Sequence, residues 1–502
     1  MKAAIACGHE QVACAAQQVL EAGGNAYDAT VAAGFAAAVA EPGLTSLGGG
    51  GFLLASTAAG RRVLFDFFVD TPGRGASHAS REPHFLPVIV RFPASEQTFN
   101  CGLGSAAVPG NLRGYLHVHA RLGRLPISDV LAPAVALARE GVELNETQAY
   151  VLGLLRPIMT LSAAGRALYA PAGRYVGARA RVRNAPLVSF LETVAAEGDG
   201  ELYEGGLARR VARDMRDGGG AITETDLAAY RVIERMPLAV GYRGRTVLTN
   251  PPPAFGGSLL SVSLRLLESA DVRALGYGSA GHLLALVAVM QEVDRLRPRA
   301  IMGEIDDETL ATCVARTRTF SRGTTHVSIS DRDGNVASMT TSNGEGSGYF
   351  VPDTGIMLNN MLGEDDLHPD GFHAFSPGMR VASMMSPSVI IEADRVRAVV
   401  GSGGSKRIRT AMLQVISNVV DFDMPLAGAV AAARVHWDGE FAQIEPGFPA
   451  AAVDALSARS PVNVWDVRNI YFGGAHAVAP EGEAAGDPRR GGVGLVLDTA
   501  LE

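Results

Sequence analysis

A threonine pair, Thr324-Thr325, follows Gly323 and stands directly before an alternating segment that predicts a β-strand. A threonine hydroxyl is a poor nucleophile unless a base takes its proton. If the bond before Thr324 is cut, the new α-amino group can be that base, because its ordinary pKa of roughly 7.7 to 8 lies near neutrality. Gly323 suits such a cut, since a residue without Cβ tolerates strained backbone. The pattern alone is more typical of two strand-forming threonines, so both interpretations stay open.

A second segment that could do chemistry is Gly401-Ser402-Gly403-Gly404-Ser405, between an expected strand and an expected helix. Backbone N–H groups at the amino end of a helix can stabilise an oxyanion. A tight turn from strand to helix uses the same residue types, so that interpretation also stays open. No lysine-threonine pair of a phosphate loop completes the segment, which argues against a nucleotide site. The sequence supports no metal site and calls for no cofactor.

The elements that must position these residues begin with a β-hairpin just after Thr324. Its strands are expected at 326–330 and 336–340, with a turn of Asp, Asn and Gly residues between them. Further strands are expected at 63–69, 388–391 and 396–400, and a helix from Arg409 to Val420 follows the glycine-rich segment. The hairpin would place Thr324 at the beginning of a strand.

Helices should occupy much of the remaining chain. The chain is expected to move straight into two alanine-rich helices, of which the second covers about 26–40 and stops at Glu41-Pro42. A long helix is expected at 282–297, and the region from about 110 to 240 is mainly helical. Helices and strands in both halves predict a layered α/β architecture.

Length and composition bound the class of protein. The 502 residues, 47% hydrophobic and 19% charged, predict a globular chain with two or more packed units. A net charge of -8 argues against a nucleic-acid partner, which favours a basic stripe. No apolar run reaches the roughly 18 to 20 residues of a membrane span. Four scattered cysteines and an amino terminus without a signal core lead us to expect a cytoplasmic protein.

Ordered motifs along nearly the whole chain resemble the γ-glutamyltranspeptidase family of N-terminal-nucleophile hydrolases. The strongest is Thr324-Thr325-His326-x-Ser328-x-x-Asp331-x-Asp333-Gly334-Asn335. The others, in chain order, are Gly23 to Ala29, Glu41-Pro42, 48–52, Val108-Pro109-Gly110, Asp226 to Tyr230, Pro251 to Gly257, 355–360, Ser386-Pro387, Gly403-Gly404 and Asp487 to Arg490.

The resemblance implies a fold and a maturation step. The fold would be an α/β (α+β) structure, the four-layer αββα sandwich of this hydrolase type. The chain would cut itself into a large subunit, 1–323, and a small subunit, 324–502. The two fragments would remain together as a heterodimer, with a higher oligomer left open.

The resemblance also implies roles for individual residues. Thr324 would be the nucleophile and, through its amino group, the base. The remaining catalytic residues would be the oxyanion donors Gly403 and Gly404, and a supporting hydroxyl, either Thr341 or Ser342, followed by Asn343.

One departure from the family pattern concerns the substrate. The family's arginine that grips the α-carboxylate of a γ-glutamyl group belongs in a motif Asp-Phe-Arg-Glu. Here the stretch reads Asp66-Phe67-Phe68-Val69, and a phenyl ring offers neither charge nor paired donors. Arg74, Arg380 or Arg407 could supply a cation from another direction.

Two further departures agree with a changed substrate. The family's paired serines near the oxyanion glycines read Ser383-Met384, so one hydroxyl has become a thioether. The acid that binds the substrate amino group has shifted register, to Glu364, Asp365 or Asp366. With Phe68, these are the predicted substrate-binding residues.

Three hypotheses follow. The leading one is a cytoplasmic, self-processing hydrolase or acyltransferase that cleaves a γ-glutamyl-like or other amide of small size, other than ordinary glutathione. The second is a carbon–carbon bond hydrolase, like the family branch that assembles alkyl-proline units of antibiotics. The third is an unprocessed, non-catalytic homologue, against which the intact Thr324, Gly403 and Gly404 argue.

Overall fold

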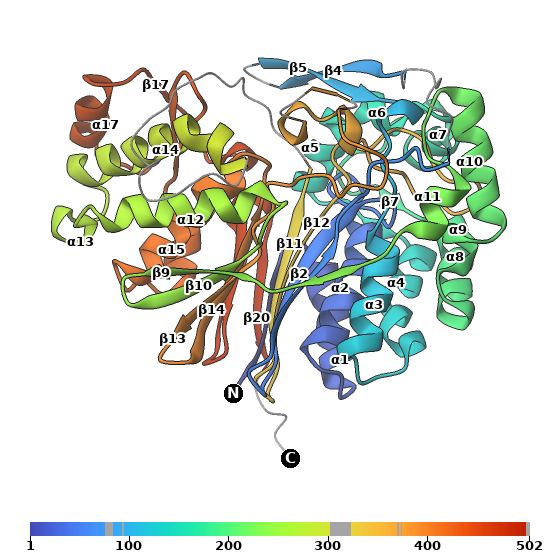
Figure 1. Ribbon diagram of the computed structural model, residues 1–502, viewed down its shortest axis with the longest axis horizontal. Coiled ribbons are helices and arrows are strands. Elements are labelled where there is room, and N and C mark those ends of the chain that lie inside the picture. Colours follow the sequence, from blue (N-terminus) through green and yellow to red (C-terminus); the bar gives the residue numbers. More distant parts are fainter. Residues whose placement is uncertain (76–83, 93–94, 302–322, 369–370, 373, 498–502) are drawn as a thin grey trace.

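Two antiparallel β-sheets pack face to face, and helices cover both outer faces (Figure 1). The computed structural model describes the chain apart from residues 76–83, 93–94, 302–322, 369–370, 373 and 498–502. The order of the layers is helix, sheet, sheet, helix, which confirms the expected αββα sandwich. Ala3, near the amino terminus, pairs with Leu497, so these two residues lie at the same end of the first sheet.

The first sheet has seven strands, and the strand that begins beside Thr324 lies near its middle. In sheet order the strands are β20 (Val493–Leu497), β1 (Ala3–Cys7), β11 (Thr325–Ser330), β12 (Val336–Ser342), β2 (Gly50–Ser56), β3 (Arg62–Phe67) and β8 (Ile233–Arg235). The second sheet has six strands, β19 (Glu483–Ala485), β18 (Gly474–Ala479), β14 (Arg395–Gly403), β13 (Ser388–Glu392), β10 (Arg245–Thr249) and β9 (Leu238–Tyr242).

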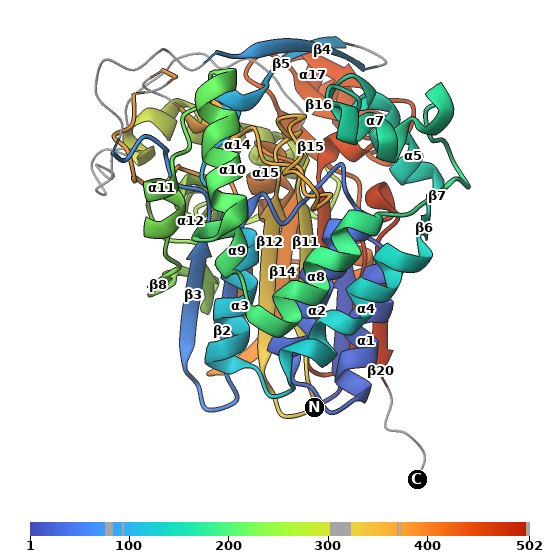
Figure 2. The same ribbon diagram turned by 90° about the vertical axis from the view of Figure 1, so that its right-hand side faces the viewer.

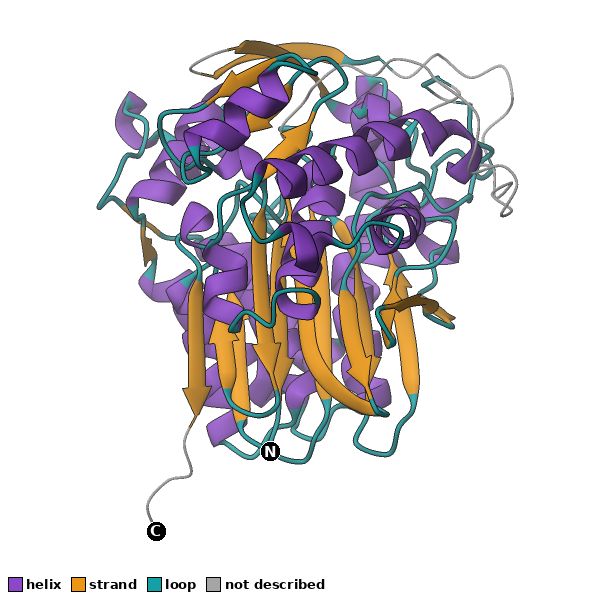
Figure 3. Cartoon of the chain, turned by 90° about the vertical axis from the view of Figure 1, so that its left-hand side faces the viewer, coloured by secondary structure: helices purple, strands orange, loops and turns teal. Residues whose placement is uncertain are grey.

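Different helices cover the two outer faces. On the first sheet lie α1 (Glu10–Glu21), α2 (Ala26–Ala40) and α3 (Asn111–Leu122), and α4 (Ile127–Glu140) packs outside α2, with α8 (Ala185–Glu197) outside α4 (Figure 2). On the second sheet lie α12 (Phe255–Glu268) and α15 (Arg407–Val420), and α14 (Ala280–Ile301) packs against α12 (Figures 1 and 3).

Smaller elements surround one end of the sandwich and the flanks. The helices are α5 (Glu146–Leu154), α6 (Arg156–Met159), α7 (Ala163–Tyr169), α9 (Gly200–Tyr203), α10 (Gly206–Gly218), α11 (Glu224–Ala229), α13 (Val272–Leu275), α16 (Leu426–Ala431) and α17 (Ala450–Ser457). The strands are β4 (Leu86–Phe92), β5 (Ser95–Cys101), β6 (Val142–Glu143), β7 (Arg181–Val182), β15 (Val435–Trp437), β16 (Ala442–Ile444) and β17 (Val462–Val464).

The hairpin of β11 and β12 is buried on both faces, and its residues alternate in chemistry. Val327 and Ile329 of β11 join the apolar core beneath α1–α4. The residues between them are polar and bind the second sheet, because successive side chains of a strand point to opposite faces. Ser328 Oγ donates to the carbonyl of His476 at 3.1 Å, and Ser338 Oγ donates to that of Val400 at 3.2 Å. These bonds fix the position of one sheet relative to the other.

The prediction that the chain moves straight into helices is wrong at its first element. β1 (Ala3–Cys7) precedes α1 and pairs with β11 on one side and β20 on the other. A short run of alanine and other apolar residues fits a buried strand or a helix equally well by pattern. The pairing partners, which lie over 300 residues away, decide in favour of the strand. The second helix is confirmed, since α2 covers Ala26–Ala40.

The described part of the chain contains no helix long and apolar enough to cross a membrane. Cys7, Cys14 and Cys101 are free thiols, and Cys313 lies outside the described residues.

The two sheets are in close contact where a glycine of β14 faces a histidine of β11. A Cβ at Gly401 would overlap the ring of His326. We therefore expect Gly401→Ala to destabilise the fold by about 1–3 kcal/mol, as overpacking of a filled interior does. Gly241→Ala in β9, where nothing lies within 4 Å of the new methyl group, is the control and should change stability by less than about 0.5 kcal/mol. Urea unfolding of both variants measures the difference, and equal midpoints would contradict this packing.

Candidate active site

Thr324 lies immediately before β11, between the two sheets, and is only 4% exposed. Its hydroxyl is 3.4 Å from the hydroxyl of Ser342, the last residue of β12. Ser342 in turn donates to the carbonyl oxygen of Gly323 and accepts the backbone N–H of Gly344 at 2.9 Å. One serine hydroxyl thus contacts both the candidate nucleophile and the carbonyl that the nucleophile would attack.

The peptide bond between Gly323 and Thr324 is enclosed by backbone. A Cβ at Gly323 would lie 2.5 Å from the carbonyl oxygen of Gly344 and 2.7 Å from that of Gly43. Contacts this short leave no room for a side chain, so glycine is the residue that fits immediately before Thr324.

The glycine pair Gly403-Gly404 lies against Thr324, as the proposed oxyanion role requires. Gly403 ends β14, and a Cβ there would overlap the carbonyl oxygen of Thr324. Gly404 has a φ of +125°, a conformation that L side chains rarely adopt, and its missing Cβ would lie 2.9 Å from Cα of Gly473. The structure brings these two glycines to the threonine. Their contribution to an oxyanion hole stays a prediction.

The structure also decides which of the two candidate hydroxyls lies at Thr324. Thr341 precedes Ser342 in β12, so its side chain points to the opposite face, where its hydroxyl accepts from Thr45 Oγ1 at 3.0 Å. Ser342 is therefore the neighbour of Thr324, and Thr341 is not. Asn343 is buried next to them and donates to the carbonyl of Leu358 at 3.4 Å.

Arg490 binds Thr324 directly, a contact that the sequence did not predict. Its Nη1 donates to the carbonyl oxygen of Thr324 at 2.7 Å. Burial lowers the pKa of Arg490 to about 10, so the side chain is still a cation at neutral pH. The motif Asp487 to Arg490 was visible in the sequence, but nothing there indicated that its last residue reaches the threonine.

A buried ion network holds the segment that carries Arg490. Asp487 accepts from Arg434 at 2.7 Å and from Arg489 at 3.2 Å. Burial alone would raise the pKa of Asp487, but the two guanidinium groups hold it at about 2. Arg489 also pairs with Glu445, so these buried charges have partners.

Glu41 is a second residue near Thr324 that the sequence did not single out as functional. It follows α2, is 4% exposed, and accepts the hydroxyl of Thr325 at 3.0 Å. In the sequence it was visible only as the residue that ends the second helix. Its partner Thr325 is 284 residues away along the chain.

A pocket of about 300 Å³ opens beside the hydroxyls of Thr324 and Ser342. Four of the predicted substrate-binding residues line it: Phe68, Glu364, Ser383 and Met384. The remaining lining residues are Met361, Leu367, Met385, Ser405 and Ile408. Asp365 is exposed and is not among the residues that line the pocket, so its role stays a prediction, and the side chain of Asp366 lies outside the described residues.

No arginine or lysine is among the described residues that line this pocket. Phe68 is 1% exposed and stacks on Phe52, with ring centroids 5.4 Å apart. The three arginines that could have replaced the family's arginine have other partners. Arg380 pairs with Asp66 and Asp70 at 3.5 and 3.2 Å, Arg74 donates to the carbonyl of Gly378, and Arg407 donates to that of Tyr471.

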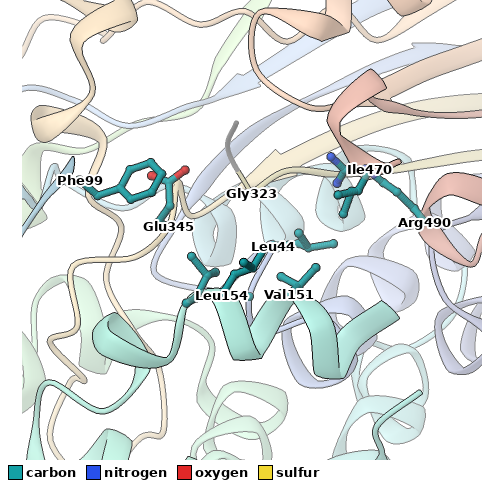
Figure 4. Close-up of a pocket in the computed structure, with 10 residues that line it drawn as sticks. Leu44, Phe99, Val151, Leu154, Gly323, Glu345, Ile470 and Arg490 are labelled. Atoms are coloured by element: carbon teal, nitrogen blue, oxygen red, sulfur yellow. The ribbon is translucent and has the colours of Figure 1, made fainter. Parts of the chain in front are cut away.

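A second pocket, of about 420 Å³, lies on the Gly323 side of the same peptide bond (Figure 4). Its walls are mostly apolar, with Arg490 and Glu345 as the charged residues. The apolar lining residues are Leu44, Phe99, Val151, Leu154, Leu155 and Ile470. The Gly323–Thr324 bond is therefore flanked by one pocket on each side.

An αββα sandwich with a threonine at the beginning of a central strand is the architecture of an N-terminal-nucleophile hydrolase. The family model "Gamma-glutamyltranspeptidase" matches residues 13–316 and 294–497, and the chain belongs to the γ-glutamyltranspeptidase family. It is thus an enzyme of the hydrolase and acyltransferase class.

Named relatives and solved structures agree with this membership. The chain is 33% identical to "Acylase ACY 1 proenzyme" of Pseudomonas sp. strain SE83, over 96% of this chain and 91% of that protein. It is 30% identical to "Glutathione hydrolase proenzyme" of Escherichia coli strain K12, over 94% and 87%. The structure is similar to that of cephalosporin acylase from Bacillus halodurans, with a TM-score of 0.82 and 25% identity over 99% and 96% of the two chains.

The position of Ser342 leads to a test that compares two adjacent hydroxyls. Ser342→Ala removes the acceptor of the Thr324 hydroxyl and the donor to the Gly323 carbonyl, so we expect cleavage of the chain to slow by about 10²-fold. Thr341→Val is the matched control, because its hydroxyl contacts Thr45 instead, and its cleavage rate should stay near that of the wild type. A time course on denaturing gels measures both rates. Slowing in Thr341→Val alone would contradict this assignment.

Proposed function

We propose that the chain is a self-processing N-terminal-threonine hydrolase that matures into 1–323 and 324–502 and acts on an amide whose acyl group carries no α-carboxylate. The observation that carries this proposal is the pocket beside Thr324, which is lined by Phe68 and by no arginine or lysine among the described residues. The proposal includes a cytoplasmic location and a heterodimer of the two fragments.

Maturation would begin when the hydroxyl oxygen of Thr324 attacks the carbonyl carbon of Gly323. The oxygen of that carbonyl would gain negative charge, and the hydroxyl of Ser342 already donates to it. The bond between that carbon and the Thr324 nitrogen would then break, with the hydroxyl proton passing to the nitrogen, and an ester between Gly323 and the Thr324 oxygen would remain. Water would then hydrolyse the ester, giving the Gly323 carboxylate and a Thr324 with a free α-amino group and a free hydroxyl.

Turnover would use the same oxygen with a new base. The α-amino group of Thr324 would take the proton of its own hydroxyl while the oxygen attacks the substrate carbonyl. The N–H groups of Gly403 and Gly404 are the proposed donors to the oxyanion. The amine leaving group would receive the proton, and water would release the acid from the Thr324 ester.

The lining of the pocket describes the acyl group that would fit. Most of its walls are apolar, contributed by Phe68, three methionines, a leucine and an isoleucine. Glu364 is buried and is the acid whose side chain lines the pocket in the described structure. We therefore propose an apolar acyl group that bears an amino or hydroxyl group for Glu364. The names of the Pseudomonas and Bacillus halodurans relatives, both acylases, agree with an amide substrate of this kind.

The two alternatives stay predictions. A carbon–carbon bond hydrolase would form the same ester on Thr324 and would differ only in its leaving group. A substrate panel should therefore contain ketones that can expel a stabilised carbanion as well as apolar amides. A non-catalytic homologue would remain a single chain.

The maturation step can be tested by removing the hydroxyl of Thr324. Wild-type protein should give a fragment that begins Thr-Thr-His-Val-Ser, and Thr324→Ala should stay uncut because it lacks the attacking oxygen. Intact mass and amino-terminal sequencing measure both results. Full activity in a protein that remains one chain would overturn the proposal.

The role of Phe68 can be tested by restoring the family residue. Wild-type enzyme should hydrolyse γ-glutamyl anilides poorly and with high KM, and Phe68→Arg should raise kcat/KM for them by roughly tenfold or more, as one charged hydrogen bond would. Activity on apolar acyl anilides should fall in the same variant. Phe68→Leu keeps an apolar side chain and is the control, with no gain on the glutamyl compound.

A different result would place the carboxylate-binding residue elsewhere. If the wild type cleaves γ-glutamyl anilide efficiently and Arg74→Ala abolishes this activity, the carboxylate clamp has moved to Arg74. The enzyme would then be an ordinary γ-glutamyl hydrolase.

A further inference from the structure

The carboxyl group of Glu41 occupies a confined space beside the start of β11. One oxygen, Oε2, accepts the hydroxyl of Thr325 at 3.0 Å. The other, Oε1, lies where a side chain at residue 8 would be, since a Cβ at Gly8 would be 2.7 Å from it. The carboxyl is thus fixed between β1 and β11, and it also lines a pocket with Arg490.

Arg490 is the cation that faces Glu41. The two side chains attract each other, and Arg490 also donates to the carbonyl oxygen of Thr324. Arg490 therefore holds the backbone carbonyl of Thr324, and Glu41 holds the side chain of the next residue, Thr325. Since neighbouring side chains of a strand point in opposite directions, holding Thr325 on one face directs Thr324 toward the other, where the pocket lined by Phe68 lies.

The other titratable groups near Glu41 carry no charge at neutral pH. Burial raises the pKa of the Cys7 thiol on β1 to about 12, and burial lowers the pKa of His9, which caps α1. On α5, the neighbours Thr147 and Gln148 line the same pocket and do not titrate. The charged group that acts on Glu41 is thus Arg490, and Asp487, Arg407 and Arg434 act in turn on Arg490.

We propose that Glu41 is a positioning residue whose ionised carboxylate, acting through Thr325 and Arg490, orients Thr324 for self-cleavage and for turnover. This inference rests on the proposed role of Thr324 as nucleophile. It adds a residue that does not touch the reacting atoms but sets their direction.

The ionisation of Glu41 gives the proposal a pH signature. Burial raises its pKa to about 7, although the hydrogen bond from Thr325 and the charge of Arg490 act in the opposite direction. Below that pH the carboxyl is neutral and no longer attracts Arg490. The rate of cleavage should therefore rise as pH increases through about 7, as Glu41 becomes ionised.

Glu41→Gln tests the charge of the side chain apart from its size. The amide has the same size and can still accept the Thr325 hydroxyl, but it carries no charge. We expect the full-length chain, synthesised in a cell-free system and followed on gels between about pH 5.5 and 8.5, to cut itself at least about tenfold more slowly and without the rise near pH 7. Its thermal stability at pH 8 should not fall, because the change removes a buried charge. A merely structural role predicts the reverse, a lower stability with an unchanged pH profile.

The partner residue supplies a second, independent pair of variants. Thr325→Val removes the hydroxyl and should slow cleavage in the same way, whereas Thr325→Ser keeps the hydroxyl and should restore it. These variants decide the question even if Glu41→Gln does not fold. Asp421→Asn, the same kind of change at a buried carboxylate after the far end of α15, is the control and should cut at the wild-type rate.

The possible outcomes separate this inference from the proposed function. Wild-type protein that remains uncut overturns the proposed function and this inference together. Wild-type protein that cuts itself, with Glu41→Gln or the Thr325 pair showing the same rate and pH profile, overturns the role of Glu41 alone. Loss of the rise near pH 7 in Glu41→Gln, with recovery in Thr325→Ser, supports it.

Discussion

The close packing of glycine backbone around Thr324 and Ser342 is the constraint on which the rest of the site depends. Three glycines from separate parts of the chain meet there. A Cβ at Gly49 would overlap the carbonyl oxygen of Ser342, one at Gly403 would overlap that of Thr324, and one at Gly323 would be pressed between two carbonyls. Because protein interiors are filled to near crystal density, larger residues would move the strands apart. The hydroxyls of Thr324 and Ser342 would then lose contact.

The charged groups near Thr324 are buried, so they are stabilised by other groups of the protein. Arg490 is buried, and an isolated guanidinium in such a place would be strongly unfavourable. Behind it, Asp487 and Glu445 are matched by Arg434 and Arg489. This network does little for stability on balance, since desolvation offsets much of the attraction. Its consequence is geometric, because it keeps a cation pointed at the carbonyl of Thr324.

The charged residues near Phe68 are also paired with one another. Asp66 has two arginine partners, Arg235 at 2.8 Å and Arg380 at 3.5 Å. Arg380 also pairs with Asp70 and donates to Tyr230. For it to bind a substrate carboxylate, these bonds would have to break. The cationic charge at this edge of the sheet is thus already used within the fold, which agrees with the proposal of an acyl group without an α-carboxylate.

The sequence predicted what depends on local patterns and could not predict what depends on register and distant contacts. The β11–β12 hairpin follows from alternation around a turn, and the glycines follow from family motifs. The contact of Arg490 with Thr324 spans 166 residues and that of Glu41 with Thr325 spans 284, so no local pattern contains them. Thr341 and Ser342 show the limit most clearly. A one-residue shift along a strand reverses the face to which a side chain points, and only the pairing of Thr341 with Thr325 in the folded sheet fixes that Ser342 lies at the nucleophile.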